Sequence, residues 1–132
     1  MTETTHQLPK VLVVEDDIFM VDLISQALKS EDYTLLIAKN GTEGIEKCQA
    51  EHPNLVLLDI ILPDQNGFDV LRQIRQMPGG NDIQVIVFSN LSEQNQKDEA
   101  TGLGAIDYMI KANTSLPEIT EKVRSVLESQ RK

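Results

Sequence analysis

Five side chains that could bind a metal ion and a phosphoryl group stand where apolar runs of the sequence stop. They are Glu15, Asp16, Asp59, Ser89 and Lys111. Clustered carboxylates repel one another, and the usual reliefs are protonation of one acid or a divalent cation among them. Oxygen ligands without histidine or cysteine suit Mg²⁺, which also takes phosphate oxygens. A hydroxyl and an ammonium at the same point would hold the remaining phosphoryl oxygens. These residue types therefore indicate phosphoryl transfer.

The runs that precede these side chains are expected to be strands of one parallel sheet. Residues 55–58 are continuously apolar, as in a strand buried on both faces. In open parallel sheets, ligands bind outside the carboxyl ends of the strands. Pro63 and Gly67 bracket the turn after Asp59, since proline lacks an N–H donor and glycine tolerates backbone angles that other residues avoid.

The apolar pattern predicts five strands that alternate with five helices. The expected strands are 10–14, 33–38, 55–59, 83–88 and 107–110. The expected helices are 18–30, 42–51, one from about 67 to a stop at 78–81, 91–103, and one that Thr114 or Ser115 caps. With right-handed crossovers, this order builds a doubly wound α/β domain with helices on both faces of a five-stranded parallel sheet.

Side chains at helical spacing mark the buried faces of the first and last helices. In the first helix they are Met20, Leu23, Ile24, Ala27 and Leu28, and in the last helix Ile119, Val123, Val126 and Leu127. Asp17 is expected to cap the first helix. Pro117 falls in the first turn of the last helix, where proline is tolerated.

Length and composition fit one domain in a reducing compartment. The 132 residues suffice for one core, with residues 1–9 as a flexible leader and 10–130 as the domain. The single cysteine, Cys48, excludes an intramolecular disulfide and a multi-cysteine metal cluster. No segment resembles a signal peptide or is long and apolar enough to span a bilayer, so we expect a cytoplasmic protein without membrane contact. The net charge of −9 argues against direct nucleic-acid binding.

Together these motifs resemble the receiver domain of two-component response regulators, from Lys10 to about Gln130. The resemblance rests on residues 13–17, Asp59 with Pro63 and Gly67, Ser89, residues 104–105 with Tyr108, and Lys111. It implies a flavodoxin-like strand order, 2-1-3-4-5. It also implies that Asp59 accepts a phosphoryl group from a phosphohistidine on a sensor histidine kinase or a phosphotransfer protein.

The resemblance assigns a role to each residue of the site. Asp16, Asp59 and the backbone carbonyl of Ile61 would bind Mg²⁺ directly, and Glu15 would act through a water. Ser89 and Lys111 would hold the phosphoryl oxygens. The domain would catalyse its own phosphorylation and dephosphorylation at Asp59 without being a conventional enzyme.

The resemblance also implies a switch and an output. Ser89 would move toward the phosphoryl group and Tyr108 would rotate inward behind it, which alters the face made by the fourth helix, fifth strand and fifth helix. The chain would then be a stand-alone, chemotaxis-regulator-like receiver. It would bind a downstream protein that the sequence does not name, as a monomer or as a phosphorylation-dependent dimer.

Four positions bear on how this chain differs from its relatives. Ala112 stands where the family usually has a proline after a cis peptide bond, and a non-proline cis bond costs about 2.5–4 kcal/mol. We therefore expect a trans or a strained loop. Asn90 is bulkier than the residue common at its position and would narrow access to the phosphoryl group. Ile61 and Leu91 cannot orient a water, so we hypothesise slow self-dephosphorylation, with a phosphoryl lifetime of many minutes or longer.

Three alternatives remain open at this point. The first is a receiver fold that serves as an unphosphorylated scaffold, which a beryllofluoride titration would distinguish. The second is a Mg²⁺-dependent phosphatase of the haloacid-dehalogenase type, but such enzymes generally need a second aspartate where this chain has Ile61. The third is a flavodoxin relative, for which the phosphate-binding loop after the first strand is missing.

Overall fold

The computed structural model describes residues 8–130, which form five strands and five α-helices. The strands are β1 (Lys10–Val14), β2 (Thr34–Ala38), β3 (Leu55–Leu58), β4 (Gln84–Ser89) and β5 (Asp107–Ile110). The helices are α1 (Ile18–Ala27), α2 (Gly41–Glu51), α3 (Gly67–Gln76), α4 (Gln94–Gly102) and α5 (Leu116–Gln130), with short 3₁₀ turns η1 (Gly80–Asp82) and η2 (Lys111–Asn113). Most of the expected leader, residues 1–9, lies outside the described residues.

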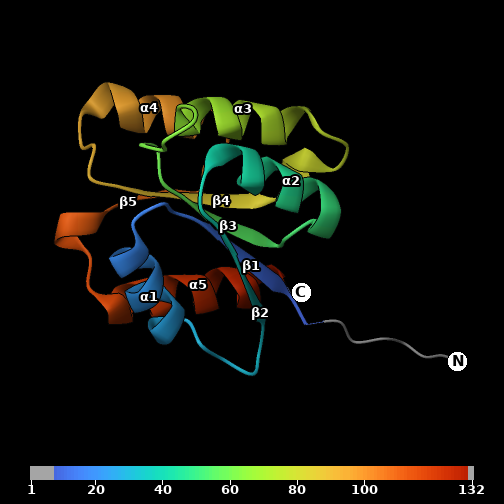
Figure 1. Cartoon of the computed structure of the whole chain (residues 1–132), viewed down its shortest axis with the longest axis vertical. Coiled ribbons are helices and arrows are strands. Elements are labelled where there is room, and N and C mark those ends of the chain that lie inside the picture. The colour runs from blue at the N-terminus through green and yellow to red at the C-terminus, as the bar shows by residue number, and fades with distance from the viewer. Residues whose placement is uncertain (1–7, 131–132) are drawn as a thin grey trace, which may run out of the picture.

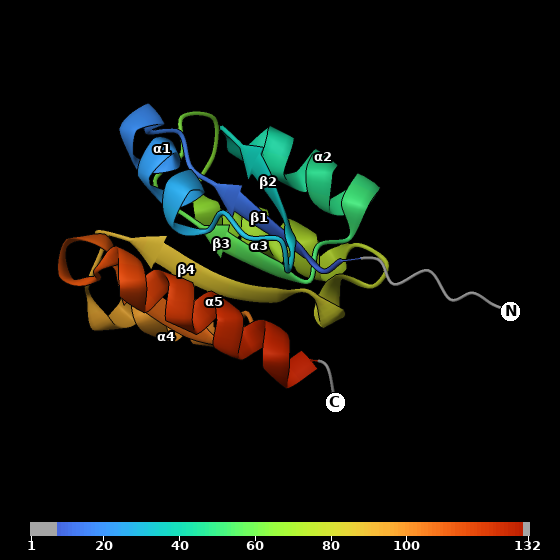
Figure 2. The same cartoon turned by 90° about the horizontal axis from the view of Figure 1, so that it is seen from below.

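The five strands form one parallel sheet in the order β2-β1-β3-β4-β5. Helices α1 and α5 cover one face, and α2, α3 and α4 cover the other (Figures 1 and 2). The predicted doubly wound fold and strand order are confirmed. Val14 is in register with Leu58, and Ser89 with Ile110, so the strands that carry the candidate site end at the same edge of the sheet.

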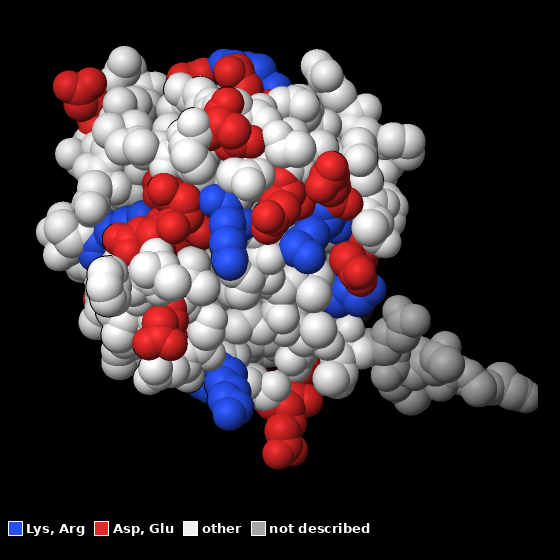
Figure 3. Space-filling view, in the orientation of Figure 1, with Lys and Arg blue, Asp and Glu red and all other residues white. Residues whose placement is uncertain are grey.

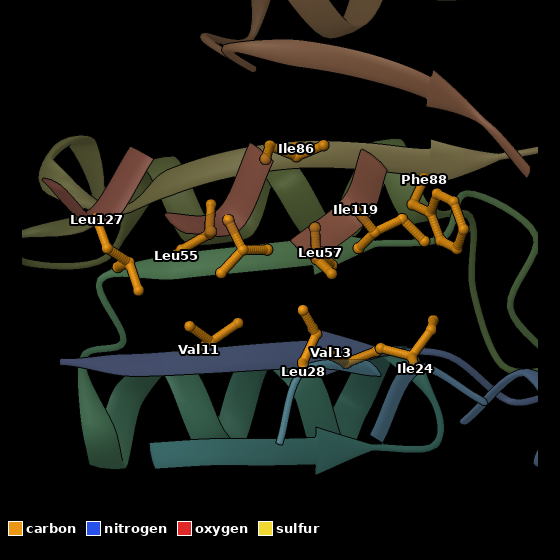
Figure 4. Close-up of a cluster of buried hydrophobic side chains, with 11 residues drawn as sticks. Val11, Val13, Ile24, Leu28, Leu55, Leu57, Ile86, Phe88, Ile119 and Leu127 are labelled. Carbon is orange, nitrogen blue, oxygen red and sulfur yellow. The ribbon is translucent and has the colours of Figure 1, made fainter. Parts of the chain in front are cut away.

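Alternate residues of the central strands enter two separate cores. Val11, Val13, Leu55 and Leu57 point toward α1 and α5 (Figure 4). Their neighbours along the strands pack against α2 and α3 instead. Both sets are almost fully buried, and each such side chain contributes about 1.5–3 kcal/mol. Burial on both faces explains why residues 55–58 are apolar without alternation.

The first helix differs from the prediction at its end and on its surface. It ends at Ala27 rather than at Ser30, and its C-cap residue Leu28 still donates its N–H to the Ile24 carbonyl at 2.8 Å. Leu23, expected in the core, is 46% exposed. Asp17 caps the helix as predicted and accepts from the N–H of Phe19 at 2.9 Å.

Helix α4 is shorter than the expected span of residues 91–103. It begins at Gln94, after the N–H of Glu93 donates to Oε1 of Gln96 at 3.1 Å. Leu91 lies in the preceding loop and packs against a small core between β4 and α4. Ala100 is the one fully buried residue of the helix, which is therefore held by few apolar contacts.

Cys48 is fully buried in α2, and burial raises the pKa of its thiol to about 12. Ser115, rather than Thr114, caps α5, since its hydroxyl accepts from the N–H of Glu118 at 3.2 Å. Between residues 8 and 130, no helix combines the length and the apolar character needed to cross a membrane.

Candidate functional site

Asp59 lies directly after β3 and is 5% exposed. Its N–H donates to the Val14 carbonyl at 3.1 Å, which extends the pairing of β1 with β3 by one residue. Its side chain faces two donors. Oδ1 accepts from the N–H of Ile61 at 3.2 Å, and Oδ2 accepts from Nζ of Lys111 at 2.8 Å. The carboxylate is thus fixed at the edge of the sheet where ligands bind in this fold class.

Glu15 and Asp16 approach Asp59 from the end of β1. The N–H of Glu15 donates to the Ala38 carbonyl at 2.9 Å, and its side chain is turned inward, so the residue is 1% exposed. Asp16 is exposed. One carboxylate oxygen from each of Glu15, Asp16 and Asp59 lies within 4.8 Å of the others. The structure therefore brings the three predicted acids into one cluster.

Lys111 places its ammonium between two of these acids. Nζ lies 2.6 Å from Oε1 of Glu15 and 2.8 Å from Oδ2 of Asp59, and it stands 5.7 Å from the centre of the Phe88 ring. Burial alone would lower the pKa of Lys111, but its contacts with Asp59 and Glu15 outweigh burial and raise it. The ammonium stays charged and offsets part of the repulsion between the carboxylates.

The acid cluster fits a divalent cation. Burial raises the pKa of Glu15, and the Asp59 charge adds to this, against the opposing effect of Lys111. Oε1 of Glu15 is paired with the Lys111 ammonium at 2.6 Å, but one lysine offsets only part of the repulsion among three neighbouring acids. The all-oxygen donor set suits Mg²⁺ better than a transition metal.

Ser89 and Tyr108 lie near the cluster without joining it. Ser89 is fully buried at the end of β4, and its Oγ accepts from the N–H of Leu91 at 3.4 Å; no hydrogen bond between Ser89 and Asp59 occurs in residues 8–130. Tyr108 packs against a small apolar cluster that includes Val87. Its hydroxyl oxygen is buried and has no hydrogen-bond partner. Burial, followed by the Asp59 charge, raises the pKa of this hydroxyl.

Gly67 is needed at the site for space rather than for its backbone angles. Its φ is not positive, so the reason given from the sequence is wrong. A Cβ at this position would lie 2.4 Å from the Asp59 carbonyl oxygen and 2.5 Å from Cα of Ile60. The N–H of Gly67 donates to the Ile60 carbonyl at 2.7 Å. Helix α3 can therefore begin directly against the backbone of the candidate phospho-acceptor only because residue 67 has no side chain.

Two polar residues that connect elements of the fold were not identified from the sequence, Asp64 beside the site and Arg75 at the opposite edge of the sheet. Asp64, in the loop after Asp59, accepts from the N–H groups of Gly41 and Thr42 at 2.8 and 2.9 Å and so ties this loop to the start of α2. Arg75 donates to four carbonyls around η1 and the α4–β5 turn, at 2.6–3.1 Å. An aspartate near a helix start is a weak sequence signal. Arg75 contacts Leu103 and Gly104, which are 28 and 29 residues away, and contacts over such distances leave no signal in a local sequence pattern.

The turn that carries Lys111 has a trans peptide bond before Ala112, since the described residues contain no cis peptide bond. Trans was one of the two expectations for this loop. The N–H of Ala112 donates to Oδ1 of Asn90 at 2.9 Å. Asn90 and Ala112, two of the four positions at which the chain was expected to differ from its relatives, are therefore in contact with each other.

Comparisons with known proteins agree with this geometry. Residues 11–124 match the model of a family described as the response regulator receiver domain. A receiver domain protein from Methanospirillum hungatei, described as CheY-like, has a TM-score of 0.83 at 29% identity, covering 95% of this chain and 98% of that one. The signal receiver domain of a putative Luxo repressor protein from Vibrio parahaemolyticus has a TM-score of 0.84 at 29% identity, covering 94% and 93%.

Curated relatives are longer than this chain. The transcriptional regulatory protein KdpE of Staphylococcus aureus is 34% identical over 117 residues, which are 89% of this chain and 49% of that protein. The alkaline phosphatase synthesis transcriptional regulatory protein PhoP of Bacillus subtilis is 32% identical over 118 residues, 89% and 48% respectively. The chain spans about half the length of the curated relatives that it matches.

Proposed function

Because the chain belongs to the receiver domain family of response regulators, we propose that Asp59 accepts a phosphoryl group from a phosphohistidine on a sensor histidine kinase or a phosphotransfer protein. One observation carries this proposal. A nearly buried carboxylate is held by a lysine on one side and stands within 4.8 Å of two further acids on the other. Few purposes other than metal-assisted phosphoryl transfer account for such a concentration of charge.

The reaction follows from the placement of these groups. A carboxylate oxygen of Asp59 forms a bond to phosphorus as the P–N bond breaks, and the imidazole nitrogen keeps the electron pair. Lys111, already at 2.8 Å from Asp59, shifts its ammonium to an oxygen of the transferred group. Ser89 donates its hydroxyl to another oxygen. Water later hydrolyses the acyl phosphate, slowly because Ile61 and Leu91 cannot orient it.

Glu15, Asp16, Asp59 and the Ile61 carbonyl would hold a Mg²⁺ ion. When bound, the ion supplies positive charge that neutralises the phosphoryl oxygens in the transition state. Glu15 would act through a water molecule. The surrounding strand ends keep these oxygens at fixed separations.

The surface beside the site suits a protein phosphodonor. Three large apolar side chains are exposed around the acid cluster: Ile18 at 71%, Phe19 at 79% and Ile61 at 58%. Ile18 and Phe19 open α1, and Ile61 follows the candidate acceptor by two residues. A partner that covers them would exclude water from the transfer and gain the free energy of apolar burial.

The signal would leave through the face made by α4, β5 and α5. Ser89 would turn from Leu91 toward the new phosphoryl group, and Tyr108 would follow behind it. Helix α4 is held by little apolar burial, so its position is open to adjustment. The net charge of −9 and the interspersed acidic and basic side chains in Figure 3 support a protein rather than a nucleic acid as the partner of this chain.

Intact-mass spectrometry after incubation with acetyl phosphate and Mg²⁺ tests the proposal directly. We expect the mass of one phosphoryl group on the wild-type chain and none on Asp59→Asn. Omission of Mg²⁺ should abolish the gain. A phosphoryl group that persists on Asp59→Asn would overturn the assignment, and an unlabelled wild type that also fails to bind beryllofluoride would favour the scaffold alternative.

A further inference from the structure

Asn90 and Ala112 form a hydrogen bond that links two loops of the site. The N–H of Ala112 donates to Oδ1 of Asn90 at 2.9 Å, across 22 residues of sequence. Both residues are exposed. Their contact is therefore not a by-product of core packing.

The bond lies just beyond the end of the sheet. Pairing between β4 and β5 stops at Ser89 and Ile110, and the chain then enters the loop of Asn90 on one side and the turn of Lys111 on the other. The side chain of Asn90 adds one more connection after the backbone ladder has ended. It joins the residue after Ser89 to the residue after Lys111.

The turn of Lys111 has few other restraints. The hydroxyl of Thr114 donates to the Ile110 carbonyl at 2.7 Å, while the N–H of Thr114 is 3.4 Å from the Lys111 carbonyl, a long hydrogen bond. A proline at position 112 would restrict φ and would have no N–H. Alanine leaves φ unrestricted and keeps an N–H that can donate. Asn90 accepts from that N–H and so restrains the backbone of the turn.

From this contact we infer that Asn90 is a positioning residue for Lys111. The inference rests on the proposed function, because it concerns the rate at which Asp59 is phosphorylated. A lysine side chain is long and flexible, so the place of its ammonium depends on where the turn holds its backbone. With the Asn90 bond, the loop of Ser89 and the turn of Lys111 move as one unit, and the two groups that hold the phosphoryl oxygens keep their separation.

This role and the steric role expected from the sequence predict opposite results. If Asn90 only narrows access to Asp59, Asn90→Ala should speed phosphorylation and the similarly bulky Asn90→Leu should not. If Asn90 positions Lys111, both variants should be slower, because both lose the acceptor for the Ala112 N–H. The expected loss in rate is about threefold to tenfold, the effect of one hydrogen bond.

The experiment measures the time course of phosphoryl gain by intact mass with acetyl phosphate and Mg²⁺, and the urea midpoint of each variant. Asn90→Asp keeps an oxygen acceptor and should recover most of the rate, with Ser92→Asp as the control for the added charge in the same loop. Ala112→Pro removes the donor of the same bond. In that background, Asn90→Leu should cause no further loss, since the two changes remove one interaction.

The outcomes separate this inference from the function on which it rests. If the wild type gains no phosphoryl group, the proposed function fails and the role of Asn90 fails with it. If the wild type is labelled and Asn90→Leu is labelled at the same rate, only the positioning role is overturned. A faster Asn90→Ala would also overturn it, in favour of the steric role. If the rate losses of Asn90→Leu and Ala112→Pro add up in the double variant, Asn90 acts through another contact, and the positioning role is overturned.

Discussion

The polar atoms in and near the site differ in how they are partnered. The Lys111 ammonium lies 2.6 Å from Oε1 of Glu15 and 2.8 Å from Oδ2 of Asp59, whereas the hydroxyl of Tyr108 is buried without a hydrogen-bond partner. Unpartnered polar atoms are rare in folded proteins, and those that occur tend to mark sites that bind or move. The unpartnered hydroxyl belongs to the residue that we propose as part of the switch.

Replacing Tyr108 with phenylalanine tests the cost of its buried hydroxyl, which has no hydrogen-bond partner. The change removes the buried hydroxyl and leaves the ring in its apolar cluster, so the free energy of unfolding should rise by about 1 kcal/mol. Urea denaturation measures it. Tyr33→Phe is the matched control, since Tyr33 is also half-buried but its hydroxyl is not a buried unpartnered group. A Tyr108→Phe variant that is less stable than the wild type would show that the hydroxyl has a partner in solution.

At the scale of helices and loops, helix α4 and the loop after Asp59 are held largely by polar contacts. Helix α4 buries only Ala100 completely, yet its end is connected to α3 by Arg75, and its face by an ion pair between Arg72 and Glu99. Asp64 similarly connects the loop after Asp59 to α2. Polar connections of this kind can be rearranged without opening a core, which suits elements that must adjust.

Arg75→Ala should weaken the corner between α3, η1 and the α4–β5 turn. The substitution removes the hydrogen bonds from the guanidinium to four carbonyls. One hydrogen bond to a charged group contributes about 1.5–3 kcal/mol, so we expect the free energy of unfolding to fall by that amount or more. Arg72→Ala, on the same helix, removes only exposed ion pairs and should cost no more than about 1 kcal/mol. Equal losses in the two variants would contradict this assignment.

The stability that Asp64 contributes by binding the start of α2 should depend on pH in a defined direction. Hydrogen bonds from the side chain of Thr42 and from the N–H groups of Gly41 and Thr42 lower the pKa of Asp64 from 3.8 to about 2. Because the pKa of Asp64 is lower in the folded state than in the unfolded state, the stabilisation is complete at a pH above the unfolded-state pKa. It is lost as the pH falls through the folded-state pKa.

The corresponding measurement compares urea midpoints of the wild type and Asp64→Asn. The wild type should be more stable by a constant margin above about pH 5. The margin should shrink between pH 3.8 and about 2, where Asp64 becomes protonated. A margin that grows on acidification would show that the charge of Asp64 does not stabilise this loop.

For the molecule as a whole, a cation bound by the clustered acids Glu15, Asp16 and Asp59 would reduce the repulsion among them and stabilise the fold. A ligand that binds only the folded state raises stability by about 2.7 kcal/mol at one hundred times its Kd. Mg²⁺ should therefore raise the thermal midpoint, in a concentration-dependent way that a chelator reverses. Asp16→Asn should reduce this response, whereas Glu46→Gln, an exposed acid on α2, should not. An equal response in all three chains would mean that Mg²⁺ acts on the net charge alone.

The sequence predicted the sheet and the carboxyl-edge cluster because both depend on local patterns. Each strand is an apolar run, and a parallel sheet necessarily brings residues such as Asp59 and Lys111 to one edge. It did not predict the exposed Leu23, because an apolar residue at helical spacing can face a partner as well as a core. The contacts of Arg75 and Asn90 escaped it because they join residues far apart in the chain, and the need for Gly67 was attributed to backbone angles rather than to a close approach.

Burial of the one cysteine makes the chain convenient for spectroscopy. The thiol of Cys48 is fully buried, and its pKa of about 12 keeps it protonated at neutral pH. Maleimide dyes, which react with the thiolate, should therefore not label it. An added cysteine at exposed Asn95, on α4, would then be labelled selectively without first removing the native thiol. The sequence contains no tryptophan, so such a dye would report without an intrinsic tryptophan background. Its emission could follow α4 in real time while Asp59 is phosphorylated.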